Sequence, residues 1–77
     1  MIKIFKVWIP FMKRIIYVEA SSALTIRKVS RRIPATAITR VNSTSPRYSL
    51  LLSFNKVIQL NEFKKIIDDY EINENIG

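Results

Sequence analysis

IKIFKVWIPFMKRIIYVEA, residues 2–20, sets the architecture, because β-branched and aromatic side chains dominate it on both sides of a proline. Such residues favour strands. The stretch also carries apolar residues at helical spacing, namely Ile2, Phe5, Ile9, Met12 and Ile16. Pro10 would break that helix in its middle, at a cost of about 3 kcal/mol. The sequence therefore predicts two strands, 2–9 and 13–20, around a turn at Pro10–Met12.

The following segment, residues 21–34, has the spacing of an amphipathic helix. Ser21 or Ser22 offers an N-cap, and Pro34 ends the pattern. At about 100° per residue, apolar and basic side chains fall on opposite sides of this helix. The apolar side holds Ala23, Ile26, Val29, Ser30 and Ile33, and the basic side holds Arg27, Lys28, Arg31 and Arg32. We expect a helix over residues 22–33.

A hairpin is predicted next. Residues 43–46, Ser-Thr-Ser-Pro, are turn formers between two segments with β-branched or alternating apolar residues, 36–42 and 47–54. One face of the second segment carries Tyr48, Leu50, Leu52 and Phe54. Leu51 lies on the other face, which favours a central strand buried on both sides.

The last third of the chain leaves one alternative open. Residues 55–56, Asn-Lys, are either a tight turn into a further strand, 57–60, or a bulge in one long strand. A helix is expected over residues 61–71, with Asn61 as its cap and a buried stripe of Phe63, Ile66, Ile67 and Tyr70. Residues 73–77 are expected to fray.

These elements predict one small α+β domain over residues 1–77. It has a mixed or antiparallel sheet of four or five strands and two helices, in the order β-β-α-β-β-(β)-α. Met12-Lys13-Arg14 would also make a natural start for a shorter chain, so whether residues 1–11 belong to the core stays open. The sequence carries no family signature.

The composition excludes several kinds of chemistry. There is no cysteine and no histidine, so disulfides, thiolate metal sites and His-based catalytic sets are impossible. The only glycine is Gly77, which excludes a glycine-rich phosphate loop. Asp68 and Asp69 point in different directions on a helix, and Glu19 is a lone carboxylate. We therefore expect no enzyme, no metal and no cofactor.

The charge is the unusual quantity. Thirteen Lys and Arg stand against six Asp and Glu, a net charge of +7. Residues 1–60 hold eleven of the basic residues and only Glu19 as an acid, whereas residues 61–77 are acidic, with five acids against Lys64 and Lys65. A basic body of this kind attracts polyanions. No uncharged apolar run reaches the roughly 18 residues of a membrane span, and we expect an intracellular protein, cytoplasmic or nucleoid-associated.

Two groups of residues are predicted to bind the phosphate backbone of nucleic acid, DNA or RNA, with low sequence specificity. The first is the basic helix side, Arg27, Lys28, Arg31 and Arg32, which has no interleaved acids to compensate it. The second flanks the 43–46 turn and consists of Arg40, Arg47 and Tyr48. The acidic segment 61–77 is expected to point away from the ligand. The alternative for both groups is a solvated, charged surface.

Other interpretations remain open. The protein is alternatively a non-catalytic interaction module, an inhibitor or an assembly subunit, that docks its basic face on an acidic protein, and an edge strand offers a homodimer contact. A weaker idea is association with anionic lipid through residues 1–14. Phe5, Trp8 and Phe11 are interpreted as core residues, with a base-stacking surface as the alternative.

Overall fold

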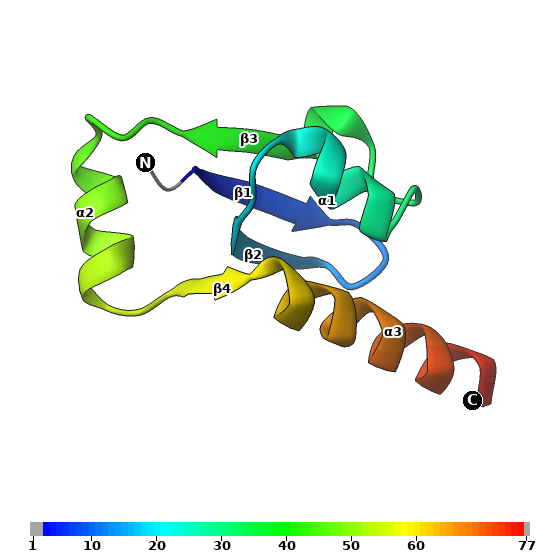
Figure 1. Ribbon diagram of the computed structural model, residues 1–77. Helices are drawn as coiled ribbons and strands as arrows, with labels where there is room; N and C mark the ends of the chain where they lie inside the picture. The colour runs from blue at the N-terminus through cyan, green and yellow to red at the C-terminus, as the bar shows by residue number, and fades with distance from the viewer. Residues whose placement is uncertain (1–2, 77) are drawn as a thin grey trace.

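The computed structural model describes residues 3–76, which form a small α+β domain with a four-stranded mixed sheet (Figure 1). The elements are β1 (Ile4–Ile9), β2 (Arg14–Glu19), α1 (Ala23–Val29), the 3₁₀ turn η1 (Ala35–Ala37), β3 (Ile38–Val41), α2 (Pro46–Ser53), β4 (Val57–Gln59) and α3 (Leu60–Ile76). None of the helices in this part of the chain is long and apolar enough to cross a membrane.

The predicted first hairpin is confirmed. β1 and β2 pair antiparallel from Ile4↔Glu19 to Ile9↔Arg14. The turn between them is closed by the Met12 amide, which donates to the Ile9 carbonyl oxygen at 3.1 Å. β1 is one of the two interior strands of the sheet, and Ile4 and Ile9 at its ends are fully buried. Strand β1 therefore supplies Ile4, Phe5, Val7 and Ile9 to the buried core.

The sheet order is β3-β1-β2-β4. β1 runs antiparallel to both of its neighbours, whereas β4 pairs parallel to β2 over Tyr17–Glu19. Parallel pairing requires a long crossover, and the crossover here contains α1, β3 and α2. The sheet is mixed, as the sequence analysis allowed.

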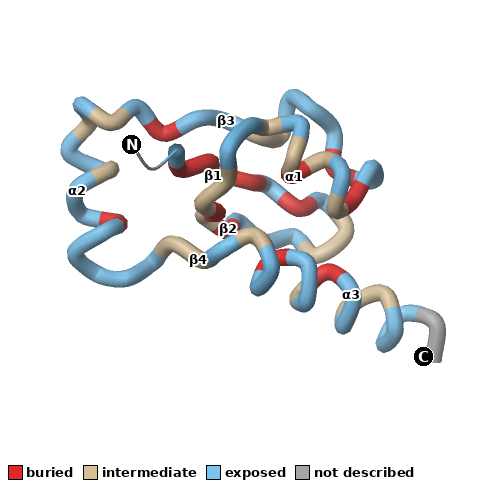
Figure 2. The backbone as a smooth tube through the Cα atoms, viewed as in Figure 1, coloured by how far each residue is buried: buried red, intermediate tan, exposed pale blue. Residues whose placement is uncertain are grey.

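The main core lies between α1, α3 and one side of the sheet, which we call the inner face. It contains every second residue of β1, because side chains alternate across a strand. Figure 2 shows the buried positions along β1 and on the sides of α1 and α3 turned to the sheet. Its buried members are Phe5, Val7, Ile9, Ile16, Val18, Ile26, Ile33, Phe63 and Ile67.

A smaller cluster lies on the opposite side of the sheet, the outer face. Ile4 and Val41 pack there against Leu51 of α2, with Tyr17, Tyr48 and Val57 partly buried around them. Figure 1 shows α2 beyond the end of the sheet where β4 begins, between the ends of β3 and β4. α2 therefore covers only one end of the outer face.

The predicted second hairpin is wrong, because residues 46–53 form helix α2. Ser45 is its N-cap, and the Ser45 Oγ accepts a hydrogen bond from the Arg47 amide at 3.2 Å. Pro46 occupies the first helical turn, where its missing N–H costs nothing. The buried side of the helix carries Tyr48 and Leu51, at helical spacing, while Leu50 is 55% exposed.

The Asn55-Lys56 pair is neither a hairpin turn nor a bulge, since it closes α2. Asn55 has a positive φ of 53° and donates its amide to the Leu52 carbonyl oxygen at 3.2 Å, and the Lys56 amide reaches the Leu51 carbonyl at 3.0 Å. These two hydrogen bonds form a Schellman motif with asparagine in the left-handed position. The order of elements is consequently β-β-α-β-α-β-α, with three helices in residues 3–76.

Two helix bounds also differ from expectation. α1 ends at Val29, and residues 30–33 form a turn in which the Ile33 amide donates to the Ser30 carbonyl oxygen at 3.3 Å. The helix ends early because Ser30 takes up extended backbone, with φ −147° and ψ 113°, four residues before Pro34. Ile33 still reaches the core through the turn. α3 continues past residue 71 to Ile76.

Candidate nucleic-acid interface

The cations predicted on one helix side come from two different elements. Arg27 and Lys28 lie in the last turn of α1, whereas Arg31 and Arg32 follow in the turn after it. They nevertheless stay close together, since Arg27, Lys28 and Arg31 line one shallow hollow of about 400 Å³ with Leu24. Lys28 and Arg31 are exposed.

Arg27 also has a structural task. Its Nε donates to the Ile33 carbonyl oxygen at 3.1 Å, and the side chain is half-buried. This hydrogen bond fastens the turn to the end of α1. Basic residues at the C-terminus of a helix are in addition favoured by the helix dipole. The hydrogen bond thus accounts for Arg27, and the helix dipole favours both Arg27 and Lys28 in the last turn of α1. Arg31 lies exposed in the turn after the helix.

Arg32 joins this surface to the first hairpin and to α3. Its guanidinium lies 4.0 Å from the centre of the Phe11 ring, a cation–π contact. Its Nη1 is 3.0 Å from the Glu74 Oε1. The turn that carries Phe11 also carries Lys13 and leads to Arg14. We call these six cations the basic end: Lys13, Arg14, Arg27, Lys28, Arg31 and Arg32.

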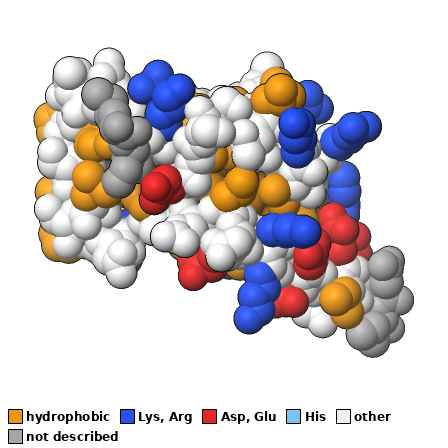
Figure 3. All heavy atoms as spheres, in the orientation of Figure 1, with side chains coloured by type: hydrophobic (Ala, Val, Ile, Leu, Met, Phe, Trp, Pro, Cys, Tyr) orange, Lys and Arg blue, Asp and Glu red, His pale blue; other side chains and the backbone are white. Residues whose placement is uncertain are grey.

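The acidic segment 61–77, expected to point away from the ligand, brings Glu74 to one of these cations. The Tyr70 hydroxyl donates to the Phe11 carbonyl oxygen at 2.6 Å, and the centroids of the two tilted rings lie 5.5 Å apart. These contacts fix the second half of α3 against the first hairpin, and the continued helix carries Glu74 to Arg32. Figure 3 shows Asp and Glu side chains beside the Lys and Arg side chains at this end of the molecule.

The second predicted group does not join the first. Arg47 and Tyr48 belong to α2, which Figure 1 places at the opposite end of the sheet from the β1–β2 turn. Tyr48 is half-buried in the outer cluster, and the Arg47 Nη1 lies 3.5 Å from the Tyr17 hydroxyl. Arg40 is exposed on the edge strand β3. No hairpin tip exists for these residues to flank.

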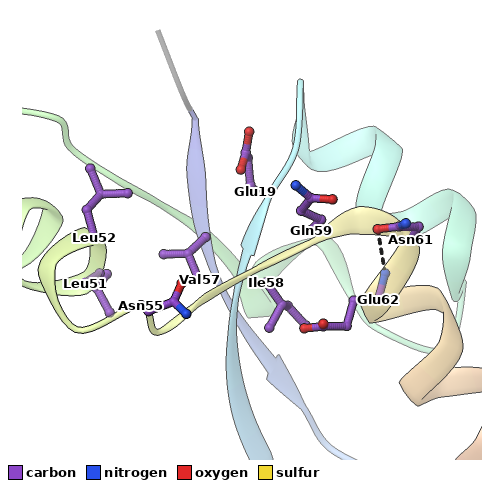
Figure 4. A pocket seen from close by; sticks show the side chains of 9 residues that line it. All are labelled: Glu19, Leu51, Leu52, Asn55, Val57, Ile58, Gln59, Asn61 and Glu62. Carbon is purple, nitrogen blue, oxygen red and sulfur yellow. Dashed lines mark hydrogen bonds between the residues drawn. The ribbon is translucent and has the colours of Figure 1, made fainter.

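The carboxylates do not gather into a site either. Glu19 and Glu62 line the same hollow of about 450 Å³, between α2 and β4. Figure 4 shows them on opposite sides of β4, where they do not point toward each other. Leu51 and Leu52 of α2 form the other wall. Within residues 3–76 no three acidic side chains converge as metal ligands would.

One exposed surface was only partly anticipated. Trp8 lies on the outer face beside Ile15, its partner in the β1–β2 register, and both are exposed. Phe5 lies in the core, as the sequence predicts, and Phe11 packs on Tyr70 and Arg32. Trp8 belongs neither to the buried core nor to the Phe11 contacts. The exposure of Trp8 could have been predicted from the alternation in β1, because Phe5, Val7 and Ile9 already fill one face of the strand.

Comparison with family models, curated proteins and solved structures finds no match for this chain.

Proposed function

We propose that this protein is a non-catalytic nucleic-acid-binding protein that contacts the phosphate backbone through its basic end. The observation that carries the proposal is the gathering of cations from α1, the following turn and the first hairpin at one end of the sheet. Within the part of the chain that the structure describes, Arg32 with Glu74 is the ion pair at this end. Lys28 and Arg31 face solvent beside them.

Phosphate is the ligand that this arrangement fits best. Arginine forks bind phosphate oxygens bidentately, and each neutralised phosphate releases counterions. The basic end contains no Asn or Gln for pairing with adenine edges. We expect low sequence specificity, DNA and RNA as ligands alike, and a cytoplasmic or nucleoid setting.

The test is a fluorescence-anisotropy titration of a labelled duplex at two salt concentrations. We expect micromolar or tighter binding at low salt, with log K falling against log salt at a slope of roughly −4 to −5 for about five phosphates. The triple variant Arg27→Ala, Lys28→Ala, Arg31→Ala is expected to lower the magnitude of the slope by about 3.

The matched control removes the same charge at the other end of the sheet, by Arg40→Ala, Arg47→Ala and Lys56→Ala. Its slope on duplex is expected to stay within about one of the parent protein. An equal loss in both triple variants would show that net charge alone drives binding and that the basic end is not the site. Absence of binding at low salt would exclude the proposed function.

The contact between Glu74 and Arg32 gives a second prediction. Glu74→Gln leaves Arg32 available to phosphate and is expected to tighten duplex binding about two- to fivefold at low salt. Stability should fall by at most about 1 kcal/mol, because both side chains are nearly half exposed. Glu62→Gln, which removes the same charge from the first turn of α3, is the control. Equal tightening in both variants would contradict a specific role for Glu74.

The alternative function is a protein-interaction module, an inhibitor or assembly subunit, and one observation favours it. α2 and the residue after it expose Leu50, Leu52 and Phe54, which nucleic-acid binding at the basic end does not use. Exposed apolar groups of this kind mark interaction surfaces. The same titration separates the two candidates, because an interaction module with an acidic protein partner need not bind oligonucleotides at all.

A further inference from the structure

The outer face of the sheet has an open half. α2 covers the end near Ile4, and the rest carries no helix in residues 3–76. This open half presents Lys6, Trp8, Ile15 and Thr39 on three neighbouring strands, and at its border with the α2 cluster it includes Tyr17, which is partly buried there. We call these five residues the outer-face platform.

Trp8 is the most unusual member of the platform. It is 41% exposed, and its register partner Ile15 is 47% exposed, so the two form an apolar pair in water. The ladder between β1 and β3 ends at Val7↔Ile38, one residue before Trp8. Trp8 therefore has a strand neighbour on only one side within the described residues. A large flat side chain in this position offers its surface to a ligand.

Cations flank the platform, and the same face carries the carboxylate of Glu19, two residues after Tyr17. Lys6 is paired in register with Tyr17 and Thr39. Beyond Ile15 and Tyr17 lies a groove of about 520 Å³ at the open edge of β2, flanked by Arg14 and Lys56. The groove exists because β4 pairs only with Tyr17–Glu19 of β2. None of the residues of the platform or the groove is acidic.

A ligand for this surface must combine flat apolar groups with negative charge. Single-stranded nucleic acid has both, since its bases stack on aromatic side chains and its phosphates bind cations. A duplex keeps its bases stacked inside and cannot offer them to Trp8. The groove beside the platform is continuous with the basic end, because Arg14 belongs to both. Arg14 pairs with Ile9 and so lies on the inner side of β2, and it meets the platform across the edge of that strand.

We propose that the outer-face platform binds single-stranded nucleic acid, with a base stacked on Trp8 and the flanking phosphates on Lys6, Arg14 and Lys56. This inference rests on the proposed function and adds a preference for unpaired strands to it. The basic end binds any phosphate backbone, whereas the platform distinguishes single strands from duplexes.

Trp8 provides its own probe, because it is the only tryptophan in the chain. Its fluorescence is followed while the protein is titrated with a thymidine oligonucleotide and, separately, with a duplex. We expect the single strand to quench Trp8 with the same midpoint that anisotropy reports. The duplex should bind by anisotropy and leave Trp8 fluorescence unchanged. Binding of both ligands without quenching overturns the inference and leaves the proposed function standing.

Variants of the platform separate stacking from charge. Trp8→Leu is expected to weaken single-strand binding about 5- to 100-fold and to leave duplex binding within about twofold. Trp8→Phe should restore part of the loss. Phe54→Leu makes a similar exchange at an exposed aromatic residue of the α2 end and should change neither affinity. Equal weakening on both ligands by Trp8→Leu overturns the inference.

Two further measurements keep the test decisive. Far-ultraviolet circular dichroism checks that the Trp8→Leu variant is folded. If that variant is unfolded, Lys6→Gln takes its place, and we expect Lys6→Gln to weaken single-strand binding about twofold or more. A titration with polyglutamate tests an acidic polypeptide as the ligand. A change of Trp8 fluorescence with polyglutamate and none with the oligonucleotide overturns the inference in favour of a protein partner.

Discussion

Phe63→Ala is expected to destabilise the protein by about 3–5 kcal/mol. Phe63 is the largest fully buried side chain, and it lies where α3 meets the inner face of the sheet. Its removal leaves a cavity that a small core fills poorly. A chain of this size has a total stability of roughly that amount. We therefore expect Phe63→Ala to be largely unfolded at 25 °C, as urea titration followed by circular dichroism will show.

Phe54→Ala is the matched control, because it removes the same side chain where that side chain is 67% exposed. Its effect on the unfolding free energy is expected to stay within about 0.5 kcal/mol. A loss below about 1 kcal/mol for Phe63→Ala would mean that α3 is peripheral to the core. Such a result would also remove the support on which Glu74 reaches Arg32.

The features that could be predicted from the sequence are those coded by short-range spacing. Alternation and a central proline identify the first hairpin, and the spacing of Phe63, Ile66, Ile67 and Tyr70 identifies the buried stripe of α3. The apolar pattern of α3 fits one period only, and in the first hairpin Pro10 excludes the helix that the spacing also allows. The apolar residues of each element are therefore the ones that become buried, because each element packs one face against the core.

Residues 47–54 fit two periods, and the prediction chose the wrong one. A dense run of apolar residues has members at both strand and helix spacing, so the pattern itself does not distinguish them. The distinguishing signal lies at the ends. Ser45-Pro46 is an N-cap followed by a proline in the first turn, and Asn55 is a left-handed C-terminal stop. Reading residues 43–46 only as turn formers concealed that signal.

The charged surface was predictable in sign and only partly in arrangement. The excess of cations before residue 60 is evident in the sequence. The pairing of Arg32 with Glu74 joins residues 42 positions apart and depends on the docking of Tyr70 against Phe11. The separation of Arg47 from the basic end depends on α2. Contacts of this kind arise from tertiary packing, and no local pattern contains them.

Leu51→Ala tests the helix that the sequence prediction missed. Leu51 is the buried residue of α2 and packs against Ile4 and Val41. Truncation is expected to cost about 2–4 kcal/mol. Because the half-buried Tyr48 is the other apolar residue by which α2 joins the outer cluster, we expect α2 to open before the rest of the domain. Amide hydrogen exchange should show lost protection in residues 46–53 and retained protection in β1 and β2.

Leu50→Ala is the matched control, since it makes the same truncation one residue away on the exposed side of α2. It is expected to cost less than about 1 kcal/mol. The comparison also distinguishes the two readings of this segment. In a strand, Leu50 would share its face with Tyr48 and Leu52, whereas in α2 the buried spacing joins Tyr48 to Leu51. A greater loss for Leu50→Ala than for Leu51→Ala would contradict the helix, and with it the placement of Arg47 away from the basic end.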